Sequence, residues 1–229
     1  MPVTLAEELV LLSLDDESGA PKEGTNTAWA AAGGLLAELV LAGRVEVADG
    51  RLTVTDRTPI GDPLLDGRLE RLAEWAGKRR PGRAKAADWL AKDRSTVVRD
   101  AEQRLCERGL VREERHRVLG LFPVRLYPEA DGSVERALRG RLAAVVLDGA
   151  DPDQRTAVLI ALLHSARLHR LAFPALPRQQ GKQVRARCAE IAEGDWAGES
   201  VREAIRNMQA TMVAVITAAT AASTVAATG

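Results

Sequence analysis

The chain has 229 residues, of which 46% are hydrophobic and 28% charged, and this balance excludes an intrinsically disordered protein. Aromatic residues make up only 3%, so the core must be built from Leu, Val and Ala, which favours packed helices over a β-sandwich. Basic and acidic residues both number 32, so the chain as a whole lacks the net positive charge typical of polyanion-binding proteins.

The first residues, MPVTLAEE, lack the basic and apolar regions of a secretory signal peptide. The two cysteines, Cys106 and Cys188, are too few for a disulfide framework and lack the spacing of a zinc site. We therefore expect a cytoplasmic protein that carries no metal and no other cofactor.

Apolar residues recur with the period of an α-helix along most of the chain. Helices are expected over residues 4–14, 26–41, 62–77, 83–92, 94–108, 133–148, 152–171, 177–193 and 197–227. Two stretches instead alternate apolar and polar residues around turn residues, which predicts β-hairpins over 45–54 and 110–127. No repeat or long linker interrupts the pattern. The sequence therefore predicts a mainly α fold, a single globular helical domain over residues 1–229 with two small β-hairpins.

Two local signals refine the first two helices. Thr4 and Glu7 have the spacing of a capping box, in which each residue satisfies a backbone N–H group of the other. Gly33 and Gly34 lie inside the second helical pattern, which predicts close packing of this helix against a neighbour.

The segment 207–229 carries no charged residue, which raises the question of a membrane-spanning helix. It consists mainly of Ala and Thr and lacks Leu, Phe and Trp, so a buried helix is the better interpretation. An apolar stripe at helical spacing predicts the face that packs on the core. The stripe consists of Met208, Met212, Val213 and Ile216.

Charge is distributed unevenly along the chain. Residues 1–67 have a net charge of −8, residues 68–117 have +6, and the remainder has +2. The middle segment includes Lys78-Arg79-Arg80 and is the candidate surface for an anionic partner. The alternative is that these charges only solvate helix faces and pair with the acidic N-terminal third.

No arrangement of residues predicts catalysis. His164 and His169 are five residues apart on an expected helix, which places them on different faces. The sequence has no dinucleotide-binding glycine motif, no Walker sequence and no serine-nucleophile elbow. We therefore expect a binding protein and not an enzyme.

The expected helix 94–108 leads directly into the hairpin 110–127, an order similar to the recognition helix and wing of a winged-helix DNA-binding protein. The basic residues of this helix suit a phosphate backbone. Its acidic residues do not, because phosphates repel carboxylates except where these read cytosine edges. The acidic residues are Asp100, Glu102 and Glu107. DNA binding is therefore the alternative hypothesis, and nucleic acid is not the expected partner.

The centre of the second hairpin is an apolar run over residues 118–124, although loop tips normally consist of polar turn residues. Arginines flank the run on both sides, namely Arg112, Arg115, Arg117 and Arg125. Apolar insertion combined with attraction to anionic headgroups is the way in which interfacial proteins bind membranes. The pattern fits equally a hairpin packed on the helical core.

Several segments carry a family resemblance through their order along the chain. They are residues 4–14 (TLAEELVLLSL), 36–45 (LAELVLAGRV), 59–66 (PIGDPLLD), 104–111 (RLCERGLV), the hairpin 112–127 and 159–166 (LIALLHSA). The sequence resembles the Golgi phosphoprotein 3 family, in its bacterial branch, over nearly the whole chain. This resemblance implies a mostly helical single domain that binds phosphatidylinositol 4-phosphate at membranes and inserts an apolar hairpin into the bilayer. The eukaryotic members also recognise cytoplasmic tails of Golgi glycosyltransferases, so tails of membrane proteins are candidate partners.

The resemblance also implies a headgroup pocket made of one tryptophan and three arginines. When the chain is aligned on LAEL at residues 36–39, these positions fall on or near residues of other types. The residues at these positions are Glu23, Ala32, Ser95 and Val98. A slip of one residue on a helix turns a side chain by about 100°. We therefore expect a headgroup pocket that is altered or absent.

Trp29, Arg94 and Arg99 lie near the family's pocket positions but out of register, and we expect them to bind an anionic headgroup. The apolar tip matches the family better, so insertion into the bilayer is expected from its largest side chains. These are Leu119, Leu121 and Phe122. The sequence therefore predicts a peripheral membrane protein whose partner is an anionic lipid membrane.

Overall fold

Helices dominate the computed structural model, which describes residues 2–15, 17–80, 82–118, 122–174, 176–177, 180–194 and 199–226. The helices are α1 (Leu5–Ser13), α2 (Gly24–Leu41), α3 (Pro63–Gly77), α4 (Ala86–Glu107), α5 (Ser133–Val146), α6 (Gln154–Ser165), α7 (His169–Ala172), α8 (Gln180–Glu193) and α9 (Glu199–Ala226). The strands form two antiparallel hairpins, β1 (Val45–Ala48) with β2 (Arg51–Val54) and β3 (Glu114–Val118) with β4 (Phe122–Leu126). The expected mainly α fold with two small hairpins is confirmed.

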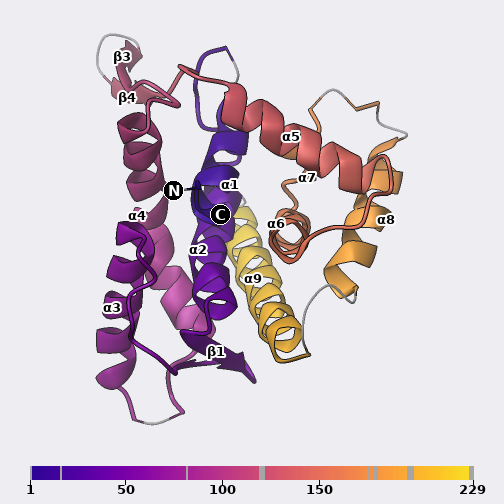
Figure 1. Cartoon of the computed structure of the whole chain (residues 1–229). Coiled ribbons are helices and arrows are strands. Elements are labelled where there is room, and N and C mark those ends of the chain that lie inside the picture. Colours follow the sequence, from indigo (N-terminus) through magenta and orange to yellow (C-terminus); the bar gives the residue numbers. More distant parts are fainter. Residues whose placement is uncertain are drawn as a thin grey trace.

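Helix α2 lies in the middle of the bundle (Figure 1). It contacts α1, α4, α6 and α9, with α3 and α4 on one side of the molecule and α5, α6 and α8 on the other. Close packing at the two glycines of α2 is confirmed. A Cβ atom on Gly33 would lie 2.6 Å from the sulfur of Met212, and one on Gly34 would lie 3.1 Å from the backbone of Ala6.

Side-chain caps explain where three of the helices begin. The capping box of Thr4 and Glu7 is present at the start of α1. Asp62 caps α3 just before Pro63, a first-turn position at which proline costs no hydrogen bond. Asp153 caps α6 by accepting from the backbone N–H group of Thr156 at 2.6 Å.

The two helices expected over 83–92 and 94–108 form one continuous helix, α4, so that prediction is wrong. Asp93, at the expected break, is buried within the helix and forms an ion pair with Arg68 of α3. The helix also begins later than expected, because the chain before it pairs with the first hairpin. The N–H group of Ala86 donates to the carbonyl of Gly50 at 2.8 Å.

The single helix expected over 152–171 is interrupted, because α6 ends at Ser165 and only the short α7 follows. Arg167 adopts the left-handed conformation (φ 59°). The N–H group of Leu168 donates back to the carbonyl of Leu163 at 2.8 Å, which is the Schellman geometry of a helix end. Leu168 itself is buried. This burial stabilises the end of α6, although the left-handed position holds an arginine and not the usual glycine.

The C-terminal segment forms α9, whose described side chains pack on the core at Met208, Met212 and Ile216. Val213 does not belong to this stripe, since 44% of it is exposed. It lies five residues after Met208, which places it about 140° around the helix. Among the described residues, no helix is both long and apolar enough to span a bilayer.

Candidate functional site

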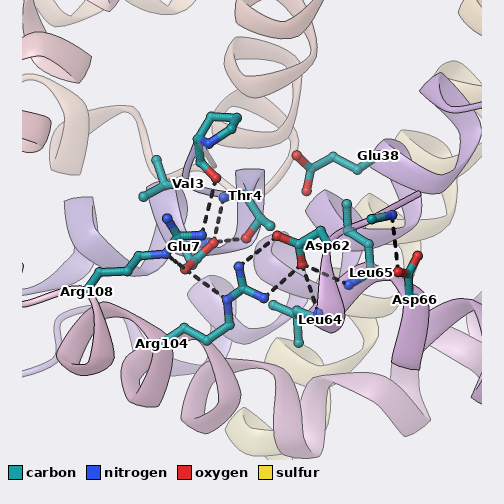
Figure 2. Close-up of polar contacts among 12 residues, drawn as sticks. Val3, Thr4, Glu7, Glu38, Asp62, Leu64, Leu65, Asp66, Arg104 and Arg108 are labelled. Atoms are coloured by element: carbon teal, nitrogen blue, oxygen red, sulfur yellow. Dashed lines mark hydrogen bonds and ion pairs between the residues drawn. The ribbon is translucent and has the colours of Figure 1, made fainter. Parts of the chain in front are cut away.

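Glu7 on α1 lies at the centre of a buried polar network (Figure 2). Its backbone N–H group donates to Thr4 Oγ1 at 3.2 Å, and its Oε2 accepts from the Thr4 backbone N–H group at 2.6 Å. Its Oε1 accepts from Arg104 Nε at 3.2 Å and from Arg108 Nε at 2.9 Å. Glu7 is completely buried, so these guanidinium groups offset the cost of removing a carboxylate from water.

Arg104 joins this network to the start of α3. Its Nη1 and Nη2 donate to the two Asp62 carboxylate oxygens at 2.8 and 2.7 Å, which is a bidentate ion pair. Asp62 also accepts from the backbone N–H groups of Leu64 and Leu65 (Figure 2). Burial alone raises the pKa of Asp62, but the bonds from Arg104 and the backbone outweigh it and hold the pKa below its usual value. One arginine therefore links α1, α3 and α4.

A second buried cluster lies where α1 meets α2, α5 and α6. Glu38 on α2 accepts from the Leu5 backbone N–H group at 3.1 Å and from Arg155 Nη1 at 2.5 Å. Glu8 accepts from Arg141 at 2.8 Å and lies 3.6 Å from Arg155. Burial raises the pKa of Glu38 to about 7, although the Arg155 charge opposes this shift.

Trp29 and Arg94, two of the residues expected to bind an anion, lie against one another. The Cζ atom of Arg94 is 4.7 Å from the centroid of the Trp29 ring, which is within cation–π range. Trp29 is 4% exposed, and its Nε1 atom has no hydrogen-bond partner in the described part of the chain. Arg94 is exposed. The third residue, Arg99, is about 140° further around α4 and lies beside Asp100, so it does not join the pair.

The β3–β4 hairpin extends beyond the C-terminal end of α4 (Figure 1). Its stem presents exposed arginines, and Arg115 is paired in register with Arg125. Glu113 lies 2.9 Å from Arg115 and 3.8 Å from Arg125. The side chains of Arg112 and Arg117 have no ion-pair partner among the residues that the structure describes. The stem therefore carries cationic groups that have no carboxylate partner in the described part of the chain.

The base of the hairpin is fastened to the loop that follows α1. The Tyr127 N–H group donates to the Gly19 carbonyl at 2.9 Å, and the Arg112 N–H group donates to the Pro128 carbonyl at 3.0 Å. Gly19 has φ +65°, and a Cβ atom there would lie 2.1 Å from the Pro128 nitrogen, so only glycine fits. Burial, and then the neighbouring Glu102 carboxylate, raise the pKa of Tyr127 to about 12.

Two of the three residues expected to insert into a bilayer, Leu119 and Leu121, lie outside the described residues. The backbone of Phe122 pairs with Val118 as the last pair of the hairpin register, but its side chain is also outside the description. Their insertion into a bilayer stays a prediction.

A family model of Golgi phosphoprotein 3 (GPP34) matches residues 5–208 of the chain. The chain belongs to the Golgi phosphoprotein 3 family. This confirms the family inferred from the order of the segments, and the match runs from the start of α1 into α9. The residues of the buried network come from three of the short segments whose order along the chain carries the family resemblance. Glu7 comes from residues 4–14, Asp62 from 59–66 and Arg104 from 104–111 (Figure 2).

The capping-box contacts of Thr4 and Glu7 were predicted from the sequence, but the arginine contacts of this network were not. The partners of Arg104 are Glu7 and Asp62, which lie 97 and 42 positions away along the chain. The capping box and the Asp62-Pro63 start of α3 are local signals that place both carboxylates at helix ends. These signals do not reveal which arginine the carboxylates contact.

The positions of the implied GPP34 headgroup pocket have other roles in this chain. Ala32 is fully buried in the core, and Val98 is half-buried against it. Glu23 adopts a left-handed conformation just before α2, and the Ser95 hydroxyl donates to a carbonyl of its own helix. None of these four positions holds a tryptophan or an arginine, and the expectation of an altered or absent pocket stays a prediction.

The described residues contain no group of three His, Cys, Asp or Glu side chains that could hold a metal ion. His164 and His169 lie on different helices, α6 and α7, and burial lowers the pKa of both imidazoles. Cys188 is buried, which raises the pKa of its thiol to about 11 and makes it a poor nucleophile. The expectation of a binding protein rather than an enzyme stays a prediction.

Proposed function

We propose that this GPP34 protein binds anionic membranes peripherally from the cytoplasmic side. The β3–β4 hairpin would insert its tip, residues 118–124, while Trp29 and Arg94 would form an altered site for a phosphoinositide headgroup. The observation that carries this proposal is the hairpin stem, whose exposed arginines flank an apolar run at the end of α4. Family membership supports the same reading.

The hairpin combines two contributions that suit a membrane surface. Each arginine near an anionic leaflet contributes about 1 kcal/mol, and this contribution falls as salt screens it. Full burial of a Leu or Phe side chain contributes roughly 1.5–3 kcal/mol, less at an interface, and depends little on salt. The anchoring of the stem through Gly19 and Tyr127 holds both parts in one orientation relative to the helices.

The Trp29–Arg94 pair would supply the headgroup contact. Packing on the indole ring restricts the exposed Arg94 guanidinium, so less conformational entropy is lost when it meets a phosphate. The Nε1 atom of Trp29 has no hydrogen-bond partner among the described residues, but it is buried, so the headgroup contact would be made by Arg94. Phosphatidylinositol 4-phosphate is the headgroup that the family resemblance implies. Because this pair replaces the implied pocket, we expect weaker discrimination among anionic lipids.

Two arrangements make DNA the less supported partner. The side chains of Arg104 and Arg108, in the second half of the proposed recognition helix, bond to buried Glu7 and cannot also contact phosphates. Asp100 of the same helix accepts from Arg68 at 2.5 Å.

Cytoplasmic tails of membrane proteins are the protein partners we propose, as a consequence of the membrane location.

Vesicle flotation tests the proposal with three lipid compositions: phosphatidylcholine alone, phosphatidylcholine with phosphatidylserine, and phosphatidylcholine with phosphatidylinositol 4-phosphate at matched charge. We expect binding only to the two anionic compositions. The double variant Leu121→Ser/Phe122→Ser should bind at least about tenfold more weakly, with little dependence on salt. The double variant Arg115→Gln/Arg117→Gln should lose binding mainly at low ionic strength.

Lys182→Gln/Arg187→Gln is the matched control, since it removes two positive charges from α8, on the other side of the molecule from the hairpin. It should bind like the parent. Equal binding by the tip variant and the parent would refute insertion of the hairpin. A DNA mobility shift at the same salt, stronger than vesicle binding and lost in the Arg94→Gln variant, would support the winged-helix hypothesis instead.

A further inference from the structure

A cavity of about 200 Å³ lies between α7, the turn that follows it and the start of α8. Cationic side chains line it, namely His169, Arg170 and Arg185. Helices α7 and α8 lie on the opposite side of the bundle from α4 and the hairpin (Figure 1). The cavity is therefore separate from the proposed membrane-binding surface.

The cationic groups of this cavity have no anionic partner among the described residues. In the part of the chain that the structure describes, the side chains of His169 and Arg170 form no ion pair or hydrogen bond. Arg185 donates only to a backbone carbonyl, that of Gly181, at 3.3 Å. Elsewhere in this protein, arginines near the interior are paired with carboxylates, as Arg104 is with Asp62.

The electrostatic surroundings of His169 agree with this geometry. Burial is the main cause that lowers the pKa of its imidazole, and neighbouring cationic groups lower it further. These groups are Arg185 on α8, His164 on α6 and Arg170 on its own helix. Among the described residues, the Glu193 carboxylate raises the pKa of His164, but this effect is smaller than the lowering by burial. An anion in the cavity would relieve this repulsion.

The rest of the cavity wall is apolar. Phe173, Leu176 and Val184 line it together with Pro174 and Pro177. Val184 is buried, while Phe173 and Leu176 are half-buried and pack on the edge of the core. The volume is below the roughly 300–1,000 Å³ of sites for drug-sized ligands, so it fits a small molecule or one end of a longer one.

We infer that this cavity binds an oxyanion, a carboxylate or a phosphate monoester, that is carried on a short apolar chain. The guanidinium groups of Arg170 and Arg185 would hold the oxyanion, because their planar donor pairs match carboxylate and phosphate oxygens. The chain would lie against Phe173, Leu176 and Val184. Protonated His169 would add a third donor once the anion is present.

Isothermal titration calorimetry with small probes tests each part of this inference. Hexanoate and hexyl phosphate carry both the oxyanion and the chain, and comparison of the two shows which oxyanion is preferred. Inorganic phosphate lacks the chain, hexanol lacks the charge, and hexylammonium has the opposite charge. We expect either or both of the first two probes to bind at least about tenfold more tightly than any of the other three.

The double variant Arg170→Gln/Arg185→Gln should lower the affinity for the preferred probe about tenfold or more. Arg136→Gln/Arg187→Gln is the matched control, because it also removes two arginines but neither lines the cavity. Circular dichroism and thermal melting establish that each variant is folded. If hexanol binds as tightly as the anions, or if the cavity variant binds like the control, the inference is wrong.

NMR titration of the His169 ring in the unsubstituted protein gives a second measurement that needs no Arg variant. The ring pKa should lie below its usual value in the free protein and should rise on addition of the preferred probe. Because hexanoate stays ionised between pH 8 and 6, its affinity should consequently increase as the pH falls over this range. A His169 pKa that does not respond to the probe would place the anion elsewhere and overturn the assignment.

Discussion

Arg94 and Arg104 lie ten residues apart on the same helix, α4, and have opposite surroundings. Arg104 reaches into the interior, where it bonds to two buried carboxylates, those of Glu7 and Asp62. Arg94 is exposed and lies on the ring of Trp29 without a carboxylate partner in the described residues. The two ends of α4 thus use the same residue type differently, one to link elements and the other to present charge.

The comparison shows why counting basic residues in a segment does not locate a binding surface. Residues 68–117 have a net charge of +6, but several of their arginines form ion pairs with carboxylates inside the protein. Arg68 is 2% exposed and bonds to Asp93 and Asp100. The charge available to a partner is therefore carried by arginines without a carboxylate partner among the described residues. These lie before α4 (Arg80 and Arg83), on its first half (Arg94) and on the hairpin stem (Arg112 and Arg117).

Replacing each of the two arginines by methionine is the most direct way to break this comparison. Arg104→Met leaves buried Asp62 without its guanidinium partner and Glu7 with Arg108 as its remaining arginine, and it should lower the free energy of unfolding by about 3–5 kcal/mol. Arg94→Met removes an exposed charge and should change it by less than about 0.5 kcal/mol. Urea unfolding of both variants at pH 7 provides the measurement, and equal effects would show that the two halves of α4 do not differ.

The pH dependence of stability tests the buried side of the comparison at Glu38. Its pKa is raised to about 7 in the folded protein from an ordinary value of 4.5. Stability from a raised pKa is fully present below the unfolded pKa and is lost as the pH rises through the folded pKa. Between pH 4.5 and 7.5, Glu38 should therefore cost the protein roughly 3 kcal/mol.

The Glu38→Gln variant keeps an acceptor for the Leu5 N–H group but cannot ionise. Urea unfolding of the parent and this variant at pH 5, 6, 7 and 7.5 isolates the contribution of Glu38 from that of other groups. We expect the difference between the two proteins to shift in favour of the variant as the pH rises. A difference that is constant across this range would mean that Glu38 is ionised throughout.

Gly19→Ala tests whether the exposed side depends on its anchoring. The left-handed backbone and the approach to Pro128 leave no room for a Cβ atom, so the variant should lose about 1–3 kcal/mol. Hydrogen exchange at the Tyr127 amide should also become faster, because its bond to the Gly19 carbonyl is lost. Gly43→Ala is a control, since Gly43 also has a positive φ (69°) but has no atom within 4 Å of its Cβ position.

The smallest expected effect concerns the affinity for vesicles. Arg94→Gln should weaken binding to anionic vesicles about two- to fivefold at low salt, and the difference should shrink toward physiological salt. Arg99→Gln should have less effect, because Asp100 lies beside Arg99 and no aromatic ring of the described residues packs on it. Flotation at two salt concentrations measures both variants. Equal losses for the two would show that the contact with Trp29 is irrelevant to binding.

The elements of the fold could be predicted where local signals determine them. Capping residues such as Thr4 and alternating strands around Asp49-Gly50 carry their own physical explanation, and the structure agrees with them. The predicted helix boundaries are wrong where contacts between residues far apart in the sequence determine whether a helix continues. Asp93 remains inside α4 because Arg68 neutralises it, and α6 ends at Ser165 because burial of Leu168 stabilises a left-handed Arg167.

The candidate site shows the same division. Trp29 and Arg94 lie near the family's pocket positions in the sequence, but their contact depends on how α2 packs on α4, which no local sequence pattern determines. The cavity beside His169 gave no sequence signal, because its members come from two helices and a turn whose arrangement follows from the unexpected end of α6. Tertiary packing therefore brings the residues of these sites together, and their spacing along the sequence does not reveal it.

The position of α2 has a consequence for synthesis of the chain on the ribosome. Nearly all of its residues from Trp29 onward are buried, and the contact at Gly33 is completed by Met212 near the end of the chain. At translation rates of about 5–20 residues per second, roughly 10–35 s pass before Met212 follows Gly33 out of the ribosome. During that time, one flank of this Ala- and Leu-rich helix has no partner within the chain. We therefore expect this apolar flank to stay exposed on the nascent chain until α9 has been synthesised.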